Sequence, residues 1–334
     1  MRFFPLLFVS LAWMGSHMNM ALQRIDIADT GSITGLILFH RGEQVHLLLS
    51  RGTQLQECSP PSLLGEPPRL VPAGEIGGNG RSAWDARPIE DAPGAIATLY
   101  VRAESAVTWV LLRRPDGGQD LRLHREPFAV YDHPHFVKGQ PASEWTASAV
   151  KYDEGASIPV VFSLGEGGRG LPASEAIGNY DGIRDARLVR DGANYWLFLL
   201  IRVPGAVDNP KVRELPSGGQ MPAILHMVRL NADFVPTSKL SGVFDNLPVY
   251  EFDADAASDG RLVVFATTPN GMVFGRGFPE EGKPLPREAW QETRFEQPLV
   301  SPSVLVEGRR AHLAAIANFR EKDASVLYGS APIE

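Results

Sequence analysis

The same acidic and basic side chains occur in the same order in two short segments far apart in the chain. Residues 84–87 read WDAR and residues 184–187 read RDAR. A carboxylate beside a guanidinium can form an ion pair, accept hydrogen bonds from a hydroxyl-rich ligand, or act as a general acid or base. Three shared letters are a weak motif, so Asp85 and Asp185 form one site only if the fold brings both segments together.

A carboxylate and two imidazoles lie within residues 131–135, which read YDHPH. In extended backbone His133 and His135 would point to the same side, a spacing that can hold a metal ion. The sequence offers no distant ligand that would complete a coordination shell. We therefore interpret the segment as a polar loop and expect no metal site.

Four acidic residues follow at short spacing at Glu251, Asp253, Asp255 and Asp259. Strand alternation would place the first three on one face, and calcium prefers oxygen ligands at such density. The segment lacks the glycine and the terminal glutamate of a helix-loop-helix calcium site. A solvated turn is therefore the favoured interpretation, with an ion site as the alternative.

Short strands are the elements that must position these residues. The apolar segments are rich in Val, Ile, Leu, Phe and Thr, are bounded by Gly, Pro, Asn or Asp, and show almost no helical periodicity. Many pair around a tight turn, and Asn270-Gly271 suits a type I′ hairpin. The expected hairpins are 33–39 with 45–49, 95–101 with 107–112, 147–151 with 160–163, 186–189 with 195–201, 262–267 with 272–274, and 303–306 with 312–316.

These hairpins recur about every 40–60 residues, which is the spacing of four-stranded propeller blades. The sequence therefore predicts an all-β fold, a β-propeller of five or six blades, with a two-sheet β-sandwich as the alternative. In a propeller, Asp85 and Asp185 would each begin an innermost strand and, with Ser301, would surround one mouth of the central axis. No sharp change in composition divides the chain, so we expect residues 23–334 to form a single domain.

Two parts of the chain resemble blades of the furanosidase-type five-bladed glycoside hydrolases. Residues 183–192 with 195–198 are similar to a blade in which an R-D-P motif opens a strand and a D-G turn follows it. Residues 299–308 with 326–331 are similar to a second blade, of the pattern aPsv…dGkyyL…vgyatS. Together the two parts cover about a quarter of the chain.

This resemblance implies that Asp185 would stabilise positive charge on a sugar or tune the catalytic acid. Hydrolysis of a glycosidic bond needs two carboxylates. The second carboxylate would come from Asp85, Glu251 or Glu296.

Departures from the family pattern bear on catalysis. Ala186 replaces the proline of R-D-P, and Val300 and Ser301 stand where the family's catalytic glutamate precedes Pro-Ser. An enzyme should show its paired carboxylates, and only Asp185 stands in a matching place. In the alternative that needs no ligand, Arg184 and Asp185 form an ion pair at the start of a strand.

If the axis binds a sugar, side chains beside the two aspartates and in the second family-like segment are expected to contact it. Tryptophan can stack on a sugar face, and guanidinium and hydroxyl groups can hydrogen-bond to its hydroxyls. The expected contact residues are Trp84, Arg184, Arg187 and Ser301.

Composition and missing motifs exclude several function classes. The net charge is −7 and the 32 Lys and Arg residues form no dense block, so we expect no nucleic-acid partner. Cys58 is the single cysteine, which excludes a disulfide framework and a multi-cysteine zinc site and favours a buried thiol. Serine-hydrolase, metalloprotease and phosphate-loop motifs are absent, and we expect no cofactor.

The N-terminus carries an apolar run at residues 3–14, preceded by Arg2. The run has the length of a signal-peptide core and is too short to span a bilayer. We expect residues 1–22 to be a leader and the protein to be periplasmic or secreted, with no membrane span. Two alternatives stay open: residues 15–18 (GSHM) resemble the remnant of a cleaved affinity tag, or translation starts at Met18 or Met20 in a cytoplasmic protein.

Taken together, these patterns favour a non-catalytic β-propeller that binds a protein or glycan partner in the bacterial envelope, such as an inhibitor or immunity-type protein. A ring of blades is a rigid platform whose loops can carry recognition. The alternative is a glycoside hydrolase or other glycan-active enzyme that uses Asp185 and a second carboxylate.

Overall fold

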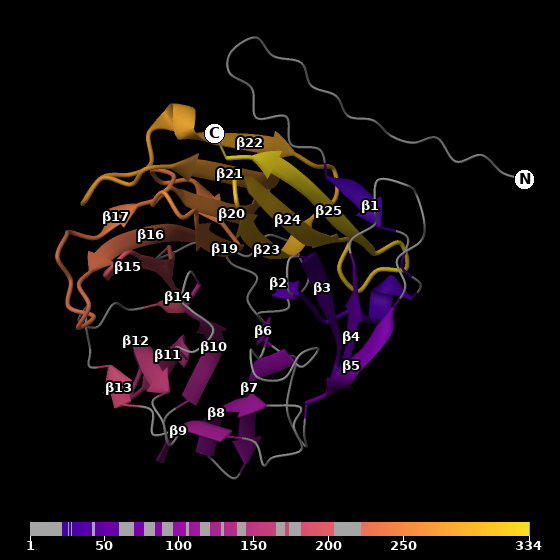
Figure 1. Cartoon of the computed structure of the whole chain (residues 1–334), viewed down its shortest axis with the longest axis horizontal. Helices are drawn as coiled ribbons and strands as arrows, with labels where there is room; N and C mark the ends of the chain where they lie inside the picture. Colours follow the sequence, from indigo (N-terminus) through magenta and orange to yellow (C-terminus); the bar gives the residue numbers. More distant parts are fainter. Residues whose placement is uncertain are drawn as a thin grey trace, which may run out of the picture.

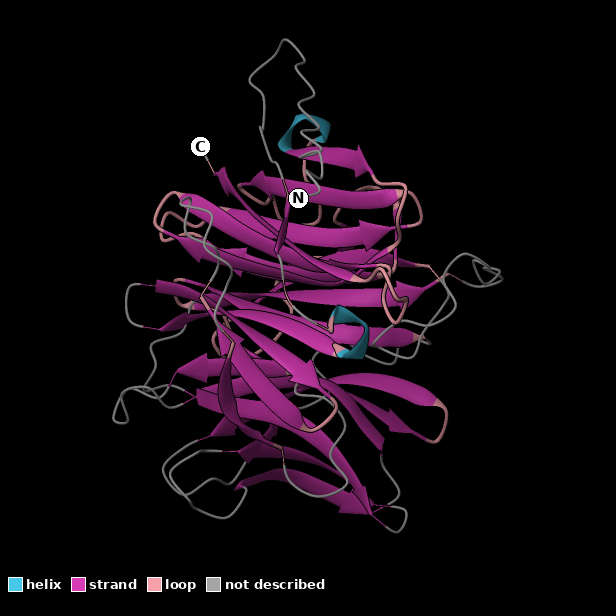
Figure 2. Cartoon of the chain, turned by 90° about the vertical axis from the view of Figure 1, so that its right-hand side faces the viewer, coloured by secondary structure: helices cyan, strands magenta, loops and turns pink. Residues whose placement is uncertain are grey.

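The computed structural model describes residues 22–25, 27, 29–41, 44–59, 70–76, 84–88, 96–104, 107–113, 121–127, 130–138, 145–164, 171–173, 182–203 and 222–333. This part of the chain contains strands and two single-turn 3-10 helices, η1 (Thr30–Ser32) and η2 (Arg287–Ala289), which Figure 2 shows among the strands. None of its helices is long and apolar enough to cross a membrane. The expected leader, residues 1–22, lies outside the described residues apart from Leu22.

The described strands form six antiparallel sheets around one axis (Figure 1). The predicted all-β propeller is therefore confirmed, and six is the larger of the two predicted blade numbers. The β-sandwich alternative is wrong because the sheets follow one another around a ring instead of stacking as one pair. All six predicted hairpins are present, and most of their strands are a few residues longer than expected.

Blades 1 to 3 follow one another along the first part of the chain, each with its first strand innermost. Blade 1 contains β2 (Gly35–Arg41), β3 (Gln44–Arg51), β4 (Gln54–Cys58) and β5 (Val71–Glu75). Blade 2 contains β6 (Asp85–Pro88), β7 (Ile96–Glu104), β8 (Val107–Arg113) and β9 (Leu121–Pro127). Blade 3 contains β10 (Val130–Phe136), β11 (Trp145–Asp153), β12 (Ala156–Leu164) and β13 (Leu171–Ala173).

Blades 4 to 6 continue in the same order. Blade 4 contains β14 (Ile183–Asp191), β15 (Asn194–Arg202), β16 (Ala223–Leu230) and β17 (Ser241–Gly242), with β18 (Pro248–Val249) also beside β16. Blade 5 contains β19 (Glu251–Ala256), β20 (Leu262–Thr268), β21 (Gly271–Gly277) and β22 (Trp290–Arg294). Blade 6 contains β23 (Leu299–Glu307), β24 (Arg310–Ala317) and β25 (Ser325–Pro332), and its outermost strand is β1 (Gln23–Ile25).

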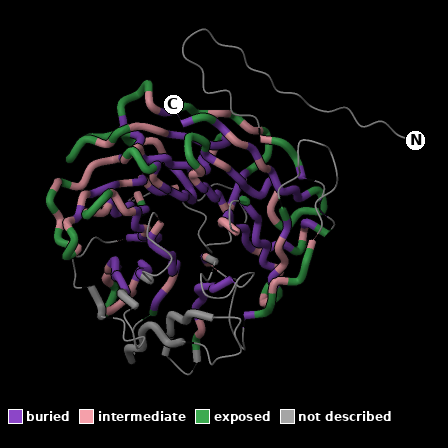
Figure 3. The backbone as a smooth tube through the Cα atoms, in the orientation of Figure 1, coloured by how far each residue is buried: buried purple, intermediate pink, exposed green. Residues whose placement is uncertain are grey.

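The apolar core is divided among the seams between neighbouring blades. Six clusters of buried apolar side chains occur in the described residues, and each joins two adjacent blades. In the seam between blades 4 and 5, for example, Trp196 and Phe198 share a cluster with Phe252. Central strands are covered on both faces, so every residue of β20 is buried and its sequence is apolar without alternation. Figure 3 shows this burial concentrated inside the ring.

One predicted turn differs from the structure. Thr268 pairs with Gly271, so the turn residues are Pro269 and Asn270 rather than Asn270 and Gly271. A type I′ turn needs positive φ at both turn residues, and the proline ring fixes φ in the negative range. Gly271 instead begins β21 with φ of 146°, beside the carbonyl of Thr293, where a Cβ atom would clash.

The ring is closed by strands from distant parts of the chain. β1 pairs antiparallel with β25, with Arg24 opposite Leu327. Ile25 is 2% exposed and belongs to the apolar cluster between blades 6 and 1. The final blade is thus complete only when residues from before blade 1 return to it.

We predict that Ile25→Ala lowers the free energy of unfolding by about 2–5 kcal/mol, because it leaves a cavity in the closing seam. Urea denaturation followed by circular dichroism measures this change. Gln23→Ala is the matched control, since Gln23 is exposed in the same strand, and it should change stability by less than about 0.5 kcal/mol. Equal stability of the two variants would show that β1 does not close the ring.

Candidate functional site at the propeller axis

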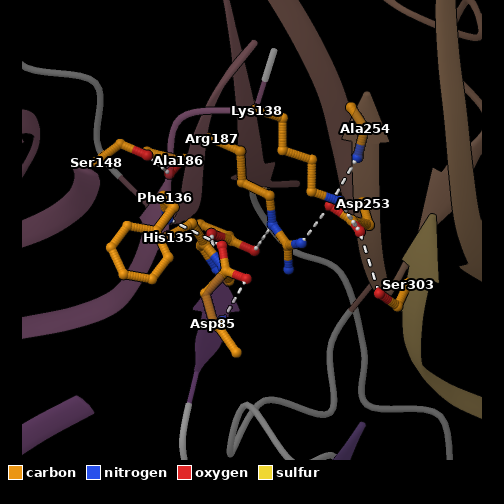
Figure 4. Close-up of polar contacts among 12 residues, drawn as sticks. Asp85, His135, Phe136, Lys138, Ser148, Ala186, Arg187, Asp253, Ala254 and Ser303 are labelled. Atoms are coloured by element: carbon orange, nitrogen blue, oxygen red, sulfur yellow. Dashed lines mark hydrogen bonds and ion pairs between the residues drawn. The ribbon is translucent and has the colours of Figure 1, made fainter. Parts of the chain in front are cut away.

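The innermost strands contact one another in a closed circle, from β2 through β6, β10, β14, β19 and β23 back to β2. Whereas the seams outside this circle are apolar, charged side chains gather within it. Figure 4 shows Asp85 from β6, His135 from β10, Arg187 from β14 and Asp253 from β19 lying close together, with Lys138 just after β10. Sequence segments from four blades therefore form one polar cluster at the axis.

Asp85 is buried at the start of β6 and joins blades 2 and 3. Its Oδ1 atom accepts a hydrogen bond from the backbone N–H of Ala86 at 2.7 Å, and its Oδ2 atom accepts one from Phe136 in β10 at 2.9 Å. Burial raises the pKa of the Asp85 carboxyl, and the positive charges near it only partly oppose this effect. The Oδ2 atom thus makes a contact between neighbouring blades, whereas the Oδ1 atom is bound within β6.

Asp185 occupies the corresponding position at the start of β14, 4% exposed. Its Oδ2 atom lies 3.2 Å from Nε of Arg187, and its Oδ1 atom lies 3.3 Å from Nε2 of His135. Burial alone would raise the pKa of this carboxyl, but Arg187 and His135 outweigh burial and hold it well below its usual range. Asp185 is therefore a buried, paired carboxylate.

His135 connects the two aspartates predicted from the repeated segments. Its Nδ1 atom lies 3.9 Å from Oδ2 of Asp85, while its Nε2 atom faces Asp185. Burial lowers the pKa of this imidazole, and the nearby Arg187 lowers it further. The predicted convergence of Asp85 and Asp185 at the axis is thus observed, with His135 between them.

Asp253 is the most heavily bonded carboxylate of the cluster. It accepts hydrogen bonds from Nζ of Lys138 at 2.5 Å and from Nη1 of Arg187 at 2.7 Å. Although burial would raise its pKa, these two cations lower it below the ordinary range. Lys138 also donates to the backbone carbonyl of Val304, so one ammonium group links the end of β10 to blades 5 and 6.

The acidic run of β19 is a set of inter-blade contacts rather than a solvated turn. Glu251, Asp253 and Asp255 are buried on one face, as strand alternation predicted. Their carboxylates accept backbone hydrogen bonds from β23, donated by Ser301 at 2.7 Å, Val304 at 2.8 Å and Val306 at 2.8 Å. The solvated-turn interpretation holds only for Asp259, which is exposed in the following turn.

The segment at residues 131–135 is likewise not a polar loop. It forms most of β10, and both histidines are buried, with His133 6% and His135 3% exposed. The strand contains a bulge between Asp132 and His135, where His133 adopts a φ of 52°. An inner strand can carry these polar residues because the axis, unlike the seams, supplies them with charged partners.

A matching bulge occurs in β23. Its pairing with β24 shifts between Val300 and Ser303, and Ser301 has a φ of 50° before Pro302. His133 likewise precedes a proline. Positive φ in residues other than glycine costs free energy and tends to occur at functional sites.

Four residues beside the axial cluster form what we call the mouth: Trp84, His133, Arg184 and Ser301. The rings of Trp84 and His133 lie 4.3 Å apart between centroids, and Trp84 is half-buried before β6. Arg184 is buried beside Asp185, and the negative charges of Glu251 and Asp185 partly offset the lowering of its pKa by burial. The predicted contact residues Trp84, Arg184 and Ser301 therefore begin inner strands, whereas Arg187 is held within the axial cluster.

Glu296 is the predicted residue that the structure does not bring into the cluster. It is exposed in the connection between β22 and β23. In the described part of the chain, no hydrogen bond or ion pair joins Glu296 to Asp85 or Asp185. Its role as a second catalytic carboxylate stays a prediction.

A reactive thiol and a metal site are the two other chemistries that the sequence raises. Cys58 is buried as expected, and burial together with Glu57 raises the pKa of its thiol to about 12, so it is a poor nucleophile. Among the described residues, no group of three His, Cys, Asp or Glu side chains is arranged to hold a metal ion.

Lys138 and the structural role of Asp253 were missed by sequence reasoning. Lys138 follows β10 without any motif around it, and it reaches Asp253, which is 115 positions away in the chain. The alternation of Glu251, Asp253 and Asp255 was the available signal. Where a propeller is expected, acidic residues at every second position of a blade's first strand, followed by an apolar strand, indicate that the acidic face points toward a polar axis.

The axial cluster can hold charge in fixed places but offers little freedom for proton transfer. A general acid must reach the substrate and exchange its proton near neutral pH. Asp185 and Asp253 are held ionised by cations, and Asp85 uses both oxygens on backbone N–H groups. The arrangement is that of a structural network beside the half-buried Trp84 and Ser301.

Comparison with known proteins supports the fold. No protein-family model matches the chain, and no curated protein matches it in sequence. Solved propeller structures do match. A subtype N10 neuraminidase-like protein of A/little yellow-shouldered bat/Guatemala has 8% identity and a TM-score of 0.51, covering 88% of this chain and 92% of that chain.

Trypanosoma rangeli sialidase in complex with sialic acid has 10% identity and a TM-score of 0.54, covering 96% of this chain and 58% of that chain. The chain thus spans just over half the length of that sialidase. A thermostable family-43 glycoside hydrolase has 9% identity and a TM-score of 0.48, covering 89% of this chain and 88% of that chain. The neuraminidase-like protein and the sialidase, both with TM-scores above 0.5, agree with the β-propeller fold of this chain.

We predict that Asp253→Asn lowers the free energy of unfolding at pH 7 by about 3–5 kcal/mol, because Lys138 and Arg187 lose their shared buried counter-charge. Asp259→Asn, at an exposed aspartate of the same blade, is the control and should cost less than about 0.5 kcal/mol. Urea denaturation measures both. If Asp253→Asn lowers the free energy of unfolding no more than the control does, the axial network does not stabilise the fold.

The same variant makes a prediction about pH. The pKa of Asp253 is lowered by folding, so its stabilising contribution is present above the unfolded pKa and is lost as pH falls through the folded pKa. The wild-type protein should therefore lose stability below about pH 4, and the loss should be shallower in Asp253→Asn. Denaturation curves at a series of acidic pH values test this, and parallel curves would contradict it.

Proposed function

We propose that this chain is a non-catalytic β-propeller that binds a glycan at the mouth formed by Trp84, His133, Arg184 and Ser301. The observation that carries the proposal is the commitment of the axial carboxylates to contacts between blades. Asp85, Asp185 and Asp253 are at most 7% exposed, and each is bound by backbone N–H groups or cations. A ligand above them meets a rigid base and not a free acid–base pair.

The mouth has two buried polar atoms that make no hydrogen bond within the described residues, although Nδ1 of His133 lies 3.7 Å from Oδ1 of Asp132. Within the described residues, the indole Nε1 of Trp84 and the imidazole Nδ1 of His133 are buried without a hydrogen bond. A buried polar group without a partner costs about 1–3 kcal/mol, so such groups suggest a ligand that would bind them. The positive φ values of His133 and Ser301 point to the same place.

A glycan suits this set of side chains better than a flat protein surface does. The Trp84 ring can pack on the apolar face of a sugar, while its N–H and the Ser301 hydroxyl can bind hydroxyl groups. Trp84, His133 and Arg184 come from three consecutive blades and Ser301 from blade 6, so the four residues are arranged around the axis, which fits a compact ligand. The sialidase found by structural comparison binds sialic acid in its own structure, which agrees with a sugar ligand on this fold.

The N-terminal segment supports a proposal about localisation. We propose that residues 1–22 are an export leader and that residues 23–334 act as a single domain in the periplasm or outside the cell. The apolar run at residues 3–14 supports export. A protein partner, including an enzyme that the propeller inhibits, is the second outcome to be tested, by affinity capture from the native host.

A glycoside hydrolase is the second candidate function, and one observation favours it. Asp85 and Asp185 lie 3.9 and 3.3 Å from the two nitrogens of one imidazole, so two carboxylates of opposite pKa shift share the axis. Opposed pKa shifts in neighbouring carboxyls are a feature of acid–base pairs. Enzymatic activity would require a ligand to displace their present contacts.

We predict that Trp84→Ala weakens glycan binding at least tenfold, equivalent to about 1.4 kcal/mol, because the stacking surface is lost. Binding is first detected on a glycan array and then measured by isothermal titration calorimetry. Phe278→Ala is the control, since Phe278 is an aromatic residue 57% exposed after β21. Unchanged affinity in Trp84→Ala would place the glycan elsewhere, and the absence of any glycan ligand would favour the protein partner.

We predict that the purified protein hydrolyses no aryl glycoside of a broad panel faster than a heat-denatured sample does. Asp185→Asn and Asp85→Asn should accordingly change stability but not turnover. Release of the aryl alcohol measures the rate. Turnover by the folded wild-type protein that either substitution abolishes would support the glycoside hydrolase and end the non-catalytic proposal.

A further inference from the structure

A second cluster of titratable side chains lies on blade 6, at the opposite end of β23 from Ser301. The hydroxyl of Tyr328 in β25 is 2.7 Å from Nδ1 of His312 in β24. The other ring nitrogen of His312, Nε2, is 3.2 Å from Oε2 of Glu307, the last residue of β23. A phenol, an imidazole and a carboxylate are therefore joined in series across three neighbouring strands.

Strand register places these side chains on one face of the blade. Tyr328 pairs with Ala314, and His312 pairs with Ser330 on one side and Leu305 on the other. Because alternate residues share a face, Glu307, His312, Tyr328 and Ser330 all point into the seam with blade 1. The series is thus fixed by the backbone of three strands and does not depend on a loop.

The cluster reaches the solvent at its Glu307 end. The side chain of Glu307 is 40% exposed and that of His312 is 12% exposed, while Tyr328 is half-buried. Arg310, exposed at the start of β24, donates a hydrogen bond to Oγ of Ser330 at 2.7 Å. From blade 1, His40 approaches with Nε2 at 3.3 Å from the carbonyl of Val306.

Burial keeps both partners of the Tyr328–His312 contact uncharged, as a hydrogen bond from a phenol to a neutral imidazole requires. Burial lowers the pKa of His312 despite the opposing effect of Glu307, so the ring is a neutral acceptor at neutral pH. Burial and Glu307 raise the pKa of Tyr328, and Arg310 partly opposes them. The phenol therefore keeps its proton at neutral pH, and its nucleophilic use depends on the position of His312 beside it.

Beyond glycan binding at the non-catalytic mouth, we propose that this cluster is a separate reactive site, in which Tyr328 is a nucleophile toward small activated carboxylic esters, His312 is its general base and Glu307 orients the imidazole. A nucleophile within hydrogen-bond distance of a base that is itself oriented by a third group is the arrangement that activates side-chain hydroxyls. Arg310, two residues before His312 in β24, is the cation that would stabilise the developing oxyanion.

The chemistry proceeds in two balanced steps. In the first, Oη of Tyr328 bonds to the ester carbonyl carbon, its proton passes to Nδ1 of His312, and the alcohol leaves with that proton while the tyrosine is acylated. In the second, water attacks the acyl carbon, His312 takes one proton from the water and returns it to the departing phenolate, and the carboxylic acid is released. The sum is ester plus water giving acid plus alcohol.

The test uses the intact protein with p-nitrophenyl acetate as the probe. Acetylation of individual tyrosines is followed by peptide mass spectrometry, and release of p-nitrophenolate is followed by absorbance. Tyr152 is the matched internal control, because it is also half-buried but donates its hydroxyl hydrogen bond to the carbonyl of Ile183 at 3.3 Å, not to a base. The comparison is made within one folded molecule, so it does not require a variant to fold.

We expect Tyr328 to be acetylated on the order of 10²-fold faster than Tyr152, which is the acceleration a positioned general base provides. His312→Gln should remove this difference, and Tyr328→Phe should remove the burst of p-nitrophenolate while Tyr152→Phe leaves it unchanged. Acetylation of Tyr328 no faster than Tyr152, or undiminished in His312→Gln, would overturn the proposal and leave the cluster as a contact between blades 6 and 1.

Discussion

The structure depends on how the edges of its innermost strands are satisfied. The first strand of each blade has one edge that no strand of its own sheet covers, and backbone N–H groups there need partners. In this chain carboxylates on one inner strand bind N–H groups of the next. Asp85 binds Phe136, Glu251 binds Ser301, and Asp253 and Asp255 bind Val304 and Val306.

Other seams use hydroxyl groups for the same purpose. The hydroxyl of Ser148 donates to the carbonyl of Ala186 between blades 3 and 4, and that of Ser303 accepts the N–H of Leu38 between blades 6 and 1. Carboxylates so deeply buried need cations, which Lys138 and Arg187 provide. The polar axis and the apolar seams therefore act together. Hydrogen bonds to backbone groups at the axis hold the blades at the distance at which their apolar faces pack.

Much of the fold could be predicted from the sequence, because hairpin spacing and strand composition are local signals. The convergence of Asp85 and Asp185 could also be predicted, since both begin an inner strand in a repeated segment. The histidine between them could not, because YDHPH has the composition of a loop and only the axis makes it suitable for a strand. The predicted type I′ turn was wrong for a similar reason. Asn-Gly alone predicts such a turn, and only the strand register shows that Pro269 is one of the two turn residues.

Acidic residues in a propeller illustrate why a functional interpretation needs contacts as well as residue types. A carboxylate that stabilises charge in a ligand and one that binds a neighbouring backbone look identical in sequence. At the axis of this protein the difference lies in the partners: Asp185 and Asp253 are bound by cations from other strands, and Asp85 by two amides. In the proposed function, ligand recognition falls to the mouth, where Trp84 and Ser301 are half-buried.

Pairing of β1 with β25 ties the start of the ring to residues at the very end of the described chain. During synthesis, five blades can assemble while the sixth still lacks its last strands, so the arc keeps two apolar flanks uncovered until β25 has been made and pairs with β1. Contacts of such long sequence separation form late and slowly. Until then the open arc exposes apolar surface and unpaired strand edges, the features that make partly folded chains prone to aggregate.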